Sequence, residues 1–300
     1  QIEAQRHTLK DAIERYKLEE LPKKPKNNCN DARHIEWFGE KIGSRLLADV
    51  TPALITEVKG IFFREKSRNE KCRKPQTWNR YLTSLSCVFD VCTRDWQWLD
   101  QNPARRVRRE REAPGRVRFL SEEERTSLLD ACEKSRSPNL HPLVVLALST
   151  GMRRGEAWRL TWPQVDLANG IIILSDTKNK EYRRVPVRGL ALELLRQHAK
   201  VRRIDTNLVF SSKRSGRTGK PFHLDCFWNK AIKASGLTNF RFHDLRHSTG
   251  SYLAMNGASL LEIAEVLGHK TLQMVKRYSH LADSHTANVV ENMNRKIFGM

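Results

Sequence analysis

The stretch LVVLALSTGMRRGE, residues 143–156, joins an apolar run to a charged turn. Residues 143–148 are apolar without interruption, and Gly151 follows them, a pattern that predicts a buried helix ending at the glycine. The chain then turns and presents Arg153. The stretch therefore predicts a helical core that carries an arginine at its edge.

A second motif, HDLRH at residues 243–247, combines histidine and arginine. His243 and Arg246 are three residues apart, a spacing that puts both side chains on one face of a helix. Arginine suits the binding of a phosphate because its planar guanidinium donates to two oxygens and keeps its charge. This helical face can therefore meet one phosphate.

Two further candidates lie near the C-terminus. A capping box at Ser259 and a glycine at Gly268 predict the two ends of a short helix. His269 follows this helix directly, and Tyr278 comes nine residues later. Two short helices in this region can fold back over one site.

These residue types suit the cutting of a phosphodiester. Negative charge grows on the phosphate as a nucleophile attacks, and losing one fixed donor for it costs about 10²- to 10³-fold in rate. Tyr278 is the candidate nucleophile, and its phenol needs nearby cations or a base to favour the phenolate. We expect Arg153, Arg246 and His243 to supply the positive charge and the base that favour the phenolate. A phenol ester of the DNA phosphate would keep the energy of the backbone bond, so rejoining would need no ATP.

The leaving 5′ oxygen needs a proton, for which a lysine on a mobile turn is a suitable general acid. Residues 171–174 and 182–187 predict a β-hairpin with Lys178 near its tip. Lys180 is the alternative, because the turn is short and the register of a hairpin is easily misread.

In these motifs the chain strongly resembles the tyrosine recombinases, the phage integrase family. The matches, in the family's order, are TG-x-R-x-x-E at 150–156, the hairpin lysine, H-x-L-R-H at 243–247, LGH at 267–269 and YSHL at 278–281. The resemblance covers roughly residues 115–285, and more loosely residues 8–111. It implies an α+β fold, mainly α with a small β-sheet or hairpin. It also implies two domains, a helical core-binding domain and a mixed catalytic domain, which close as a clamp around duplex DNA.

The resemblance also implies roles for the residues at the phosphate. Arg153 and Arg246 would clamp the scissile phosphate, and His243 would assist the nucleophile. Tyr278 would form a 3′-phosphotyrosyl bond.

Three more residues match the family's pattern. Lys178 would protonate the leaving hydroxyl, and His269 would hydrogen-bond the phosphate. Glu156 matches a supporting acidic position, where it would orient a partner and not take part in the chemistry.

The HDLRH motif also resembles the helix of zinc proteases, which carries two histidines four residues apart. We do not interpret it as a metal site, because its acid is aspartate, Arg246 would repel a cation and no third ligand is evident. His247 is interpreted as a packed or supporting residue. The sequence predicts no metal and no cofactor.

The composition fits a nucleic-acid partner. The 300 residues include 54 Lys and Arg against 34 Asp and Glu, for a formal charge of +20 and a pI near 10.0. Solubility or attraction to a membrane surface is the alternative meaning of such a charge. No apolar run reaches the about 18 residues of a membrane span. The six cysteines lack metal-binding spacing and are interpreted as reduced thiols, which favours a cytoplasmic location. We also expect association with the bacterial nucleoid.

A basic run divides the chain. Residues 1–112 are predicted to form the helical DNA-binding domain, with residues 1–7 as a linker from a preceding segment, and residues 115–300 the catalytic domain. Residues 104–118 form the linker, with seven arginines and two glutamates, and we expect it to track DNA phosphates. The arginines assigned to this role are Arg105, Arg106, Arg108, Arg109, Arg116 and Arg118.

The C-terminal segment 284–298 predicts a tail helix with Ala287, Val290, Met293 and Ile297 on one face. This helix has too little apolar surface to stand alone, so it must dock. In the resembling family it docks on a neighbouring protomer, and docking on its own domain is the alternative. We expect a monomer in free solution and a homotetramer on DNA.

The predicted function is that of a site-specific recombinase or integrase that acts on double-stranded DNA sites and integrates or excises a mobile element. Accessory DNA-bending proteins are further candidate partners. The alternatives are an Xer-type chromosome resolvase, a type IB topoisomerase-like nicking-closing enzyme and a non-catalytic DNA-binding protein of the same fold.

Overall fold

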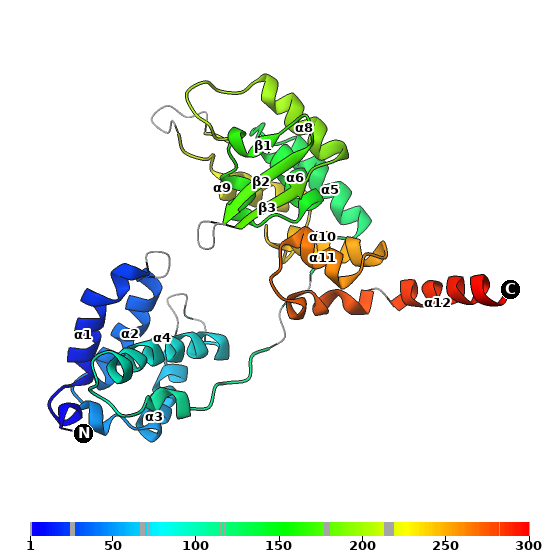
Figure 1. Ribbon diagram of the computed structural model, residues 1–300. Helices are drawn as coiled ribbons and strands as arrows, with labels where there is room; N and C mark the ends of the chain where they lie inside the picture. The colour runs from blue at the N-terminus through cyan, green and yellow to red at the C-terminus, as the bar shows by residue number, and fades with distance from the viewer. Residues whose placement is uncertain are drawn as a thin grey trace. The chain divides into compact units, whose positions relative to one another are not determined.

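The computed structural model describes residues 2–24, 28–66, 70, 72–113, 116, 118–176, 181–212, 219–281 and 283–299. The chain divides into two compact units, Gln1–Gly115 and Arg116–Met300 (Figure 1). Each unit has its own hydrophobic core.

The N-terminal unit is helical throughout its described part. Its helices are α1 (Leu9–Glu19), α2 (Asn28–Ile42), α3 (Pro52–Arg64) and α4 (Pro75–Arg94), with short 3₁₀ turns at Glu3–Gln5, Leu21–Lys23, Leu47–Asp49 and Pro103–Arg106. Thr51 caps α3 because its side chain accepts from the backbone N–H of Leu54. The core forms where α4 buries one apolar face, including Trp78 and Phe89, against α2.

The C-terminal unit combines helices with one small sheet. Its helices are α5 (Glu122–Glu133), α6 (Leu140–Thr150), α7 (Arg154–Trp158), α8 (Gly189–Lys200), α9 (Leu224–Ala234), α10 (Asp244–Met255), α11 (Leu260–Leu267) and α12 (Asp283–Phe298). Short 3₁₀ turns lie at Trp162–Gln164 (η5), Leu272–Met274 (η6) and Lys276–Leu281 (η7). The α+β class predicted from the sequence is confirmed.

The sheet is antiparallel with the order β1 (Val165–Asp166), β2 (Ile171–Asp176) and β3 (Glu181–Pro186). Ile172 pairs with Val185, and both side chains are buried. The predicted hairpin is therefore present, while the two-residue strand β1 was not predicted. Lys178 and Lys180, the two candidates for the hairpin lysine, lie outside the described residues.

Helix α6 is the centre of this unit, where it packs against α5, α8 and α10. It ends, as predicted, at Gly151, which is in the left-handed region with φ of 61°. A Cβ at Gly151 would collide with Leu267 at the end of α11. The glycine thus turns the chain toward Arg153 and also lets α11 approach α6.

Helix α12 forms over the segment predicted as a tail helix. Its described apolar side chains at Val290, Met293 and Ile297 are 48%, 48% and 63% exposed. Over the described ranges, no helix is both long and apolar enough to cross a bilayer.

Candidate active site

All six predicted catalytic residues belong to the C-terminal unit, and the structure describes five of them. Arg153 precedes α7, His243 and Arg246 begin α10, His269 follows α11, and Tyr278 lies in η7. They lie within electrostatic reach of one another: Arg153 and Arg246 both lower the pKa values of His243 and His269, and Arg246 also acts on Tyr278. Residues from four elements thus meet in one cluster.

Glu156 holds Arg153 at its backbone and at its side chain. The backbone N–H of Arg153 donates to one carboxylate oxygen at 2.9 Å, and its Nη1 donates to the other at 2.8 Å. The Nη2 atom of Arg153 also donates to the carbonyl of Gly268 at 3.2 Å. The side chain of Arg153 is still 47% exposed, so an oriented cationic side chain is accessible to solvent.

Arg246 is buried, with 4% of its surface exposed. Its Nη1 donates to the carbonyl of Gly151 at 2.6 Å, while its buried Nη2 has no hydrogen-bond partner among the described residues. Burial, with the charges of Arg153 and Arg183, lowers the pKa of Arg246 to about 10, so the group stays cationic at neutral pH. An unpartnered cationic N–H is a suitable donor to an anion.

Tyr278 is packed inside the unit and is 1% exposed. Burial raises the pKa of its phenol, and the opposing charges of Arg277 and Arg246 are the smaller influence. This corrects the expectation that nearby cations favour the phenolate, because in this arrangement the loss of solvent outweighs them.

The phenol oxygen of Tyr278 lies 2.9 Å from Nδ1 of His247. His243, which was expected to assist the nucleophile, instead contacts His247 edge-on, with ring centroids 5.4 Å apart. The reason is helical geometry: His247 lies one turn further along α10 than His243, toward Gly250, where the tyrosine ring packs. Of the two roles offered for His247 in the sequence analysis, packing and support, this contact fits the supporting one.

All three histidines at the cluster have lowered pKa values. Burial lowers the pKa of His247 to about 4, and the charges of His243 and Arg277 add to this effect. Burial and then Arg246 and Arg153 lower the pKa of His269 to about 4. Burial and Arg246 also lower the pKa of His243. These imidazoles are therefore neutral near pH 7, and a neutral imidazole can accept a proton.

Arg183 is a residue that the sequence analysis missed. It lies on β3 between two exposed neighbours, Tyr182 and Arg184, and its own side chain is only 20% exposed. Alternate residues of a strand point to opposite faces, so the spacing of Arg183 from the apolar residues Val185 and Val187 was the available signal in the sequence.

The arginines of the basic linker differ in their surroundings. Arg116 donates to the Asp244 carboxylate at 2.8 Å, and Arg118 forms a two-point pair with Glu124. These guanidinium groups already have protein partners, so they are not free to pair with phosphates in this arrangement. The prediction that they contact DNA stays untested.

The remaining predicted linker arginines lie in the N-terminal unit and are exposed. Arg105 pairs with Asp90 at 2.9 Å, and Arg109 donates to the hydroxyl of Thr83 at 3.2 Å. Arg106 and Arg108 have no ion-pair or hydrogen-bond partner within the described ranges. These two arginines are the better candidates for DNA contact.

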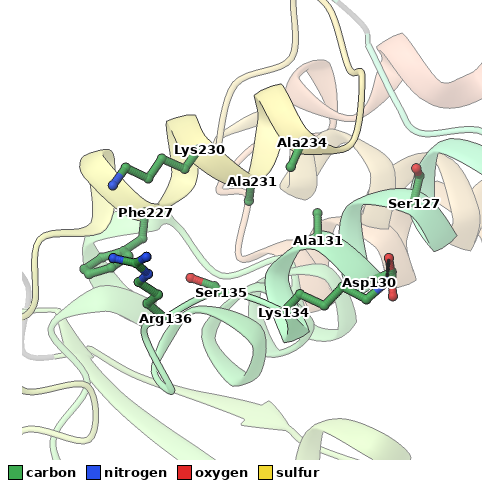
Figure 2. A pocket seen from close by; sticks show the side chains of 10 residues that line it. All are labelled: Ser127, Asp130, Ala131, Lys134, Ser135, Arg136, Phe227, Lys230, Ala231 and Ala234. Carbon is green, nitrogen blue, oxygen red and sulfur yellow. Dashed lines mark hydrogen bonds and ion pairs between the residues drawn. The ribbon is translucent and has the colours of Figure 1, made fainter.

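In the part of the chain that the structure describes, no three His, Cys, Asp or Glu side chains gather as a metal site would require. A cavity of about 620 Å³ lies between α5 and α9, and none of the catalytic candidates lines it. Figure 2 shows the residues that do. Its wall includes Phe227 and Lys230 on α9 and Lys134, which pairs with Asp130 at 2.8 Å.

Comparison with known proteins gives matches over most of the chain. The phage integrase family matches residues 118–285. The chain is 29% identical to the integrase of Salmonella phage P22 over 231 residues, which are 73% of this chain and 57% of that protein. It is 33% identical to the shufflon-specific DNA recombinase of Escherichia coli over 221 residues, which are 71% of this chain and 54% of that protein. The chain thus spans less than two thirds of the length of these relatives.

Two solved structures share the fold. The Tn1549 transposon integrase, in complex with a circular intermediate DNA, has a TM-score of 0.76 at 16% identity, and the match covers 94% of this chain and 99% of that one. A lambda integrase dimer bound to a COC′ core site has a TM-score of 0.72 at 20% identity, with 92% and 96% covered.

Proposed function

The chain belongs to the phage integrase family, and on that premise we propose that it is a site-specific DNA recombinase that cuts and rejoins DNA through Tyr278. Its relatives include phage integrases and a shufflon-specific recombinase, which supports a role in integrating or excising a mobile element. The proposal depends on one observation: the phenol of Tyr278 is hydrogen-bonded to His247, which is neutral near pH 7, and lies within the electrostatic influence of Arg246.

In the proposed reaction, Arg153 and Arg246 bind the scissile phosphate. Arg153 is oriented by Glu156 and exposed, while Arg246 has a buried Nη2 that no described protein atom uses. Two such donors stabilise the charge that develops on the phosphate, each by about 3–4 kcal/mol. His269 is the third proposed ligand of the phosphate, and its buried Nδ1 has no partner among the described residues.

The phenol oxygen of Tyr278 then attacks the phosphorus, and the bond from phosphorus to the 5′ oxygen breaks. The phenol proton passes to a neutral histidine, for which His247 is in contact and His243 is adjacent. We keep Lys178 as the proposed donor of a proton to the 5′ oxygen. The products are a 3′-phosphotyrosyl bond and a free 5′ hydroxyl, and the reverse attack rejoins the strand.

The proposed partner is double-stranded DNA that carries recombination sites, bound as a homotetramer, with accessory DNA-bending proteins as further candidates. Arg106 and Arg108 are the linker arginines that we assign to phosphate contact. Solved lambda integrase structures include a tetramer bound to a Holliday junction, which supports the proposed assembly.

The test uses a DNA duplex with a nick close to the cleavage point, so that a short fragment leaves and the covalent adduct accumulates. We expect an adduct at the 3′ phosphate that is absent with Tyr278→Phe. An adduct that persists unchanged in Tyr278→Phe would disprove the assignment of the nucleophile. Recombination of paired sites, and not relaxation of supercoils alone, distinguishes the recombinase from a topoisomerase.

A further inference from the structure

Arg183 connects three parts of the C-terminal unit. It lies on β3, the second strand of the hairpin. Its Nη2 donates to the carbonyl of Val266 at 2.7 Å, near the end of α11, and its Nη1 lies 3.4 Å from the Glu156 carboxylate. One side chain thus links the hairpin, the turn that carries His269 and the acid that holds Arg153.

The side chain of Arg183 leaves no room for a side chain at Gly268. A Cβ at Gly268 would lie 2.6 Å from Nε and 2.7 Å from Cδ of Arg183. Gly268 also has a φ of 65°, a conformation that glycine adopts at little cost. The glycine therefore ends α11 and at the same time makes space for the guanidinium.

Arg183 and Glu156 carry opposite charges and form an ion pair. The carboxylate accepts both the backbone N–H and Nη1 of Arg153, and Arg183 is its second cationic neighbour. A second cationic contact on the carboxylate limits the positions that the acid can adopt, and so the positions of the arginine that it holds.

We propose that Arg183 is a positioning residue for the cleavage reaction, which orients Arg153 through Glu156 by anchoring the acid to the end of α11. This inference rests on the proposed function. Contact with the phosphate through Nη1 or Nη2 of Arg183 is disfavoured because both atoms face protein acceptors. The buried Nε, like Nη2 of Arg246, has no hydrogen-bond partner among the described residues, but it lies against Gly268, where a Cβ would come within 2.6 Å of it.

The experiment measures single-turnover cleavage of the nicked substrate by Arg183→Met, with DNA affinity and melting temperature measured in parallel. We expect cleavage to fall between about 10- and 100-fold, the scale of a small misplacement of a catalytic group. DNA affinity should change less than about 2-fold, because binding is spread over many phosphates. Arg184→Met is the matched control: it removes the same charge from the next residue of β3, whose side chain is exposed, and should cleave as wild type does.

A double-mutant cycle tests how Arg183 acts. If it works through Arg153, adding Arg183→Met to Arg153→Ala should cost less than about 2-fold further. A full additional loss in that background would mean direct contact or a general folding role and would overturn the proposal.

Arg183→Lys is the second variant, because a lysine keeps the charge and can still reach one of the two acceptors. We expect it to recover part of the activity lost in Arg183→Met. If Arg183→Met does not fold, Arg183→Lys decides the question, and cleavage equal to wild type would then overturn the inference. Absence of the adduct in the wild-type protein would instead contradict the proposed function, so the two failures are separable.

Discussion

The ring of Tyr278 lies directly against Gly250 in α10. A Cβ at Gly250 would lie 2.7 Å from Cζ and 2.8 Å from Cε2 of the tyrosine. In a helix interior, alanine is normally preferred to glycine by up to about 1 kcal/mol. The glycine is therefore explained by the tyrosine that it accommodates, and it fixes how deep the nucleophile lies.

Gly250→Ala should consequently destabilise the unit, by roughly 1–3 kcal/mol of overpacking, despite the better helix propensity of alanine. Denaturant unfolding monitored by circular dichroism measures the effect. Gly155→Ala is the matched control, because nothing lies within 4 Å of a Cβ placed there. A Gly250→Ala protein as stable as Gly155→Ala would show that the ring moves aside without cost.

The partial burial of two histidines makes stability depend on pH. His247 and His269 have ordinary pKa values of 6.5 that fall to about 4 in the folded chain, so between these values the unfolded chain binds more protons. Their contribution is complete above about pH 6.5 and is lost as the pH falls toward 4.

We therefore expect the free energy of unfolding to decrease from pH 6.5 to pH 4, and the doubly substituted His247→Gln, His269→Gln protein to show a weaker dependence. Unfolding curves at several pH values give the slope. His223→Gln, at an exposed histidine of the same unit, should keep the wild-type slope. An unchanged slope in the double variant would contradict the assignment to these two residues.

Local signals predicted several helix ends. The capping box at Ser259 and the glycines at Gly151 and Gly268 mark helix ends in the structure, because these interactions form within a few residues. The strand β1 escaped prediction because two residues carry no periodicity.

The long-range contacts of the site could not be predicted in the same way. The bond from Tyr278 to His247 and the bond from Arg183 to Val266 span 31 and 83 residues. The sequence motifs identified which residues meet in the cluster, but which imidazole contacts the phenol depends on how η7 packs on α10. The raised pKa of Tyr278 could not be predicted from the sequence either. It results from burial of the phenol, and burial depends on how distant segments pack.

The hairpin between β2 and β3 leads to a prediction about its lysine. Lys178→Ala should lose cleavage of a normal phosphate but regain it on a substrate with sulfur at the 5′ bridging position, because a thiolate leaves without a proton. Single-turnover cleavage of the paired substrates measures the recovery. Lys180→Ala is the control, and recovery with Lys180→Ala but not Lys178→Ala would move the role of general acid to Lys180.

The assembly of the whole protein depends on where α12 docks. A helix of 16 residues is marginal by itself in water, and three of its apolar side chains, Val290, Met293 and Ile297, are exposed in the single chain. In the assembly proposed above, a second copy of this chain on an adjacent DNA site is the partner that we expect to cover them.

Deleting the chain after Asp283 should therefore spare binding to one DNA site but impair synapsis and recombination, while the free protein stays monomeric with or without the tail. Light scattering on paired sites and a recombination assay measure both properties. Serine at Val290, Met293 and Ile297 should reproduce the deletion, because those residues share one face of α12. Serine at Glu291, Asn292 and Arg295, on the other face and without a change in net charge, is the matched control. Normal recombination by the truncated protein would rule out the docking of α12 between protomers, since a helix needed there cannot be lost without effect.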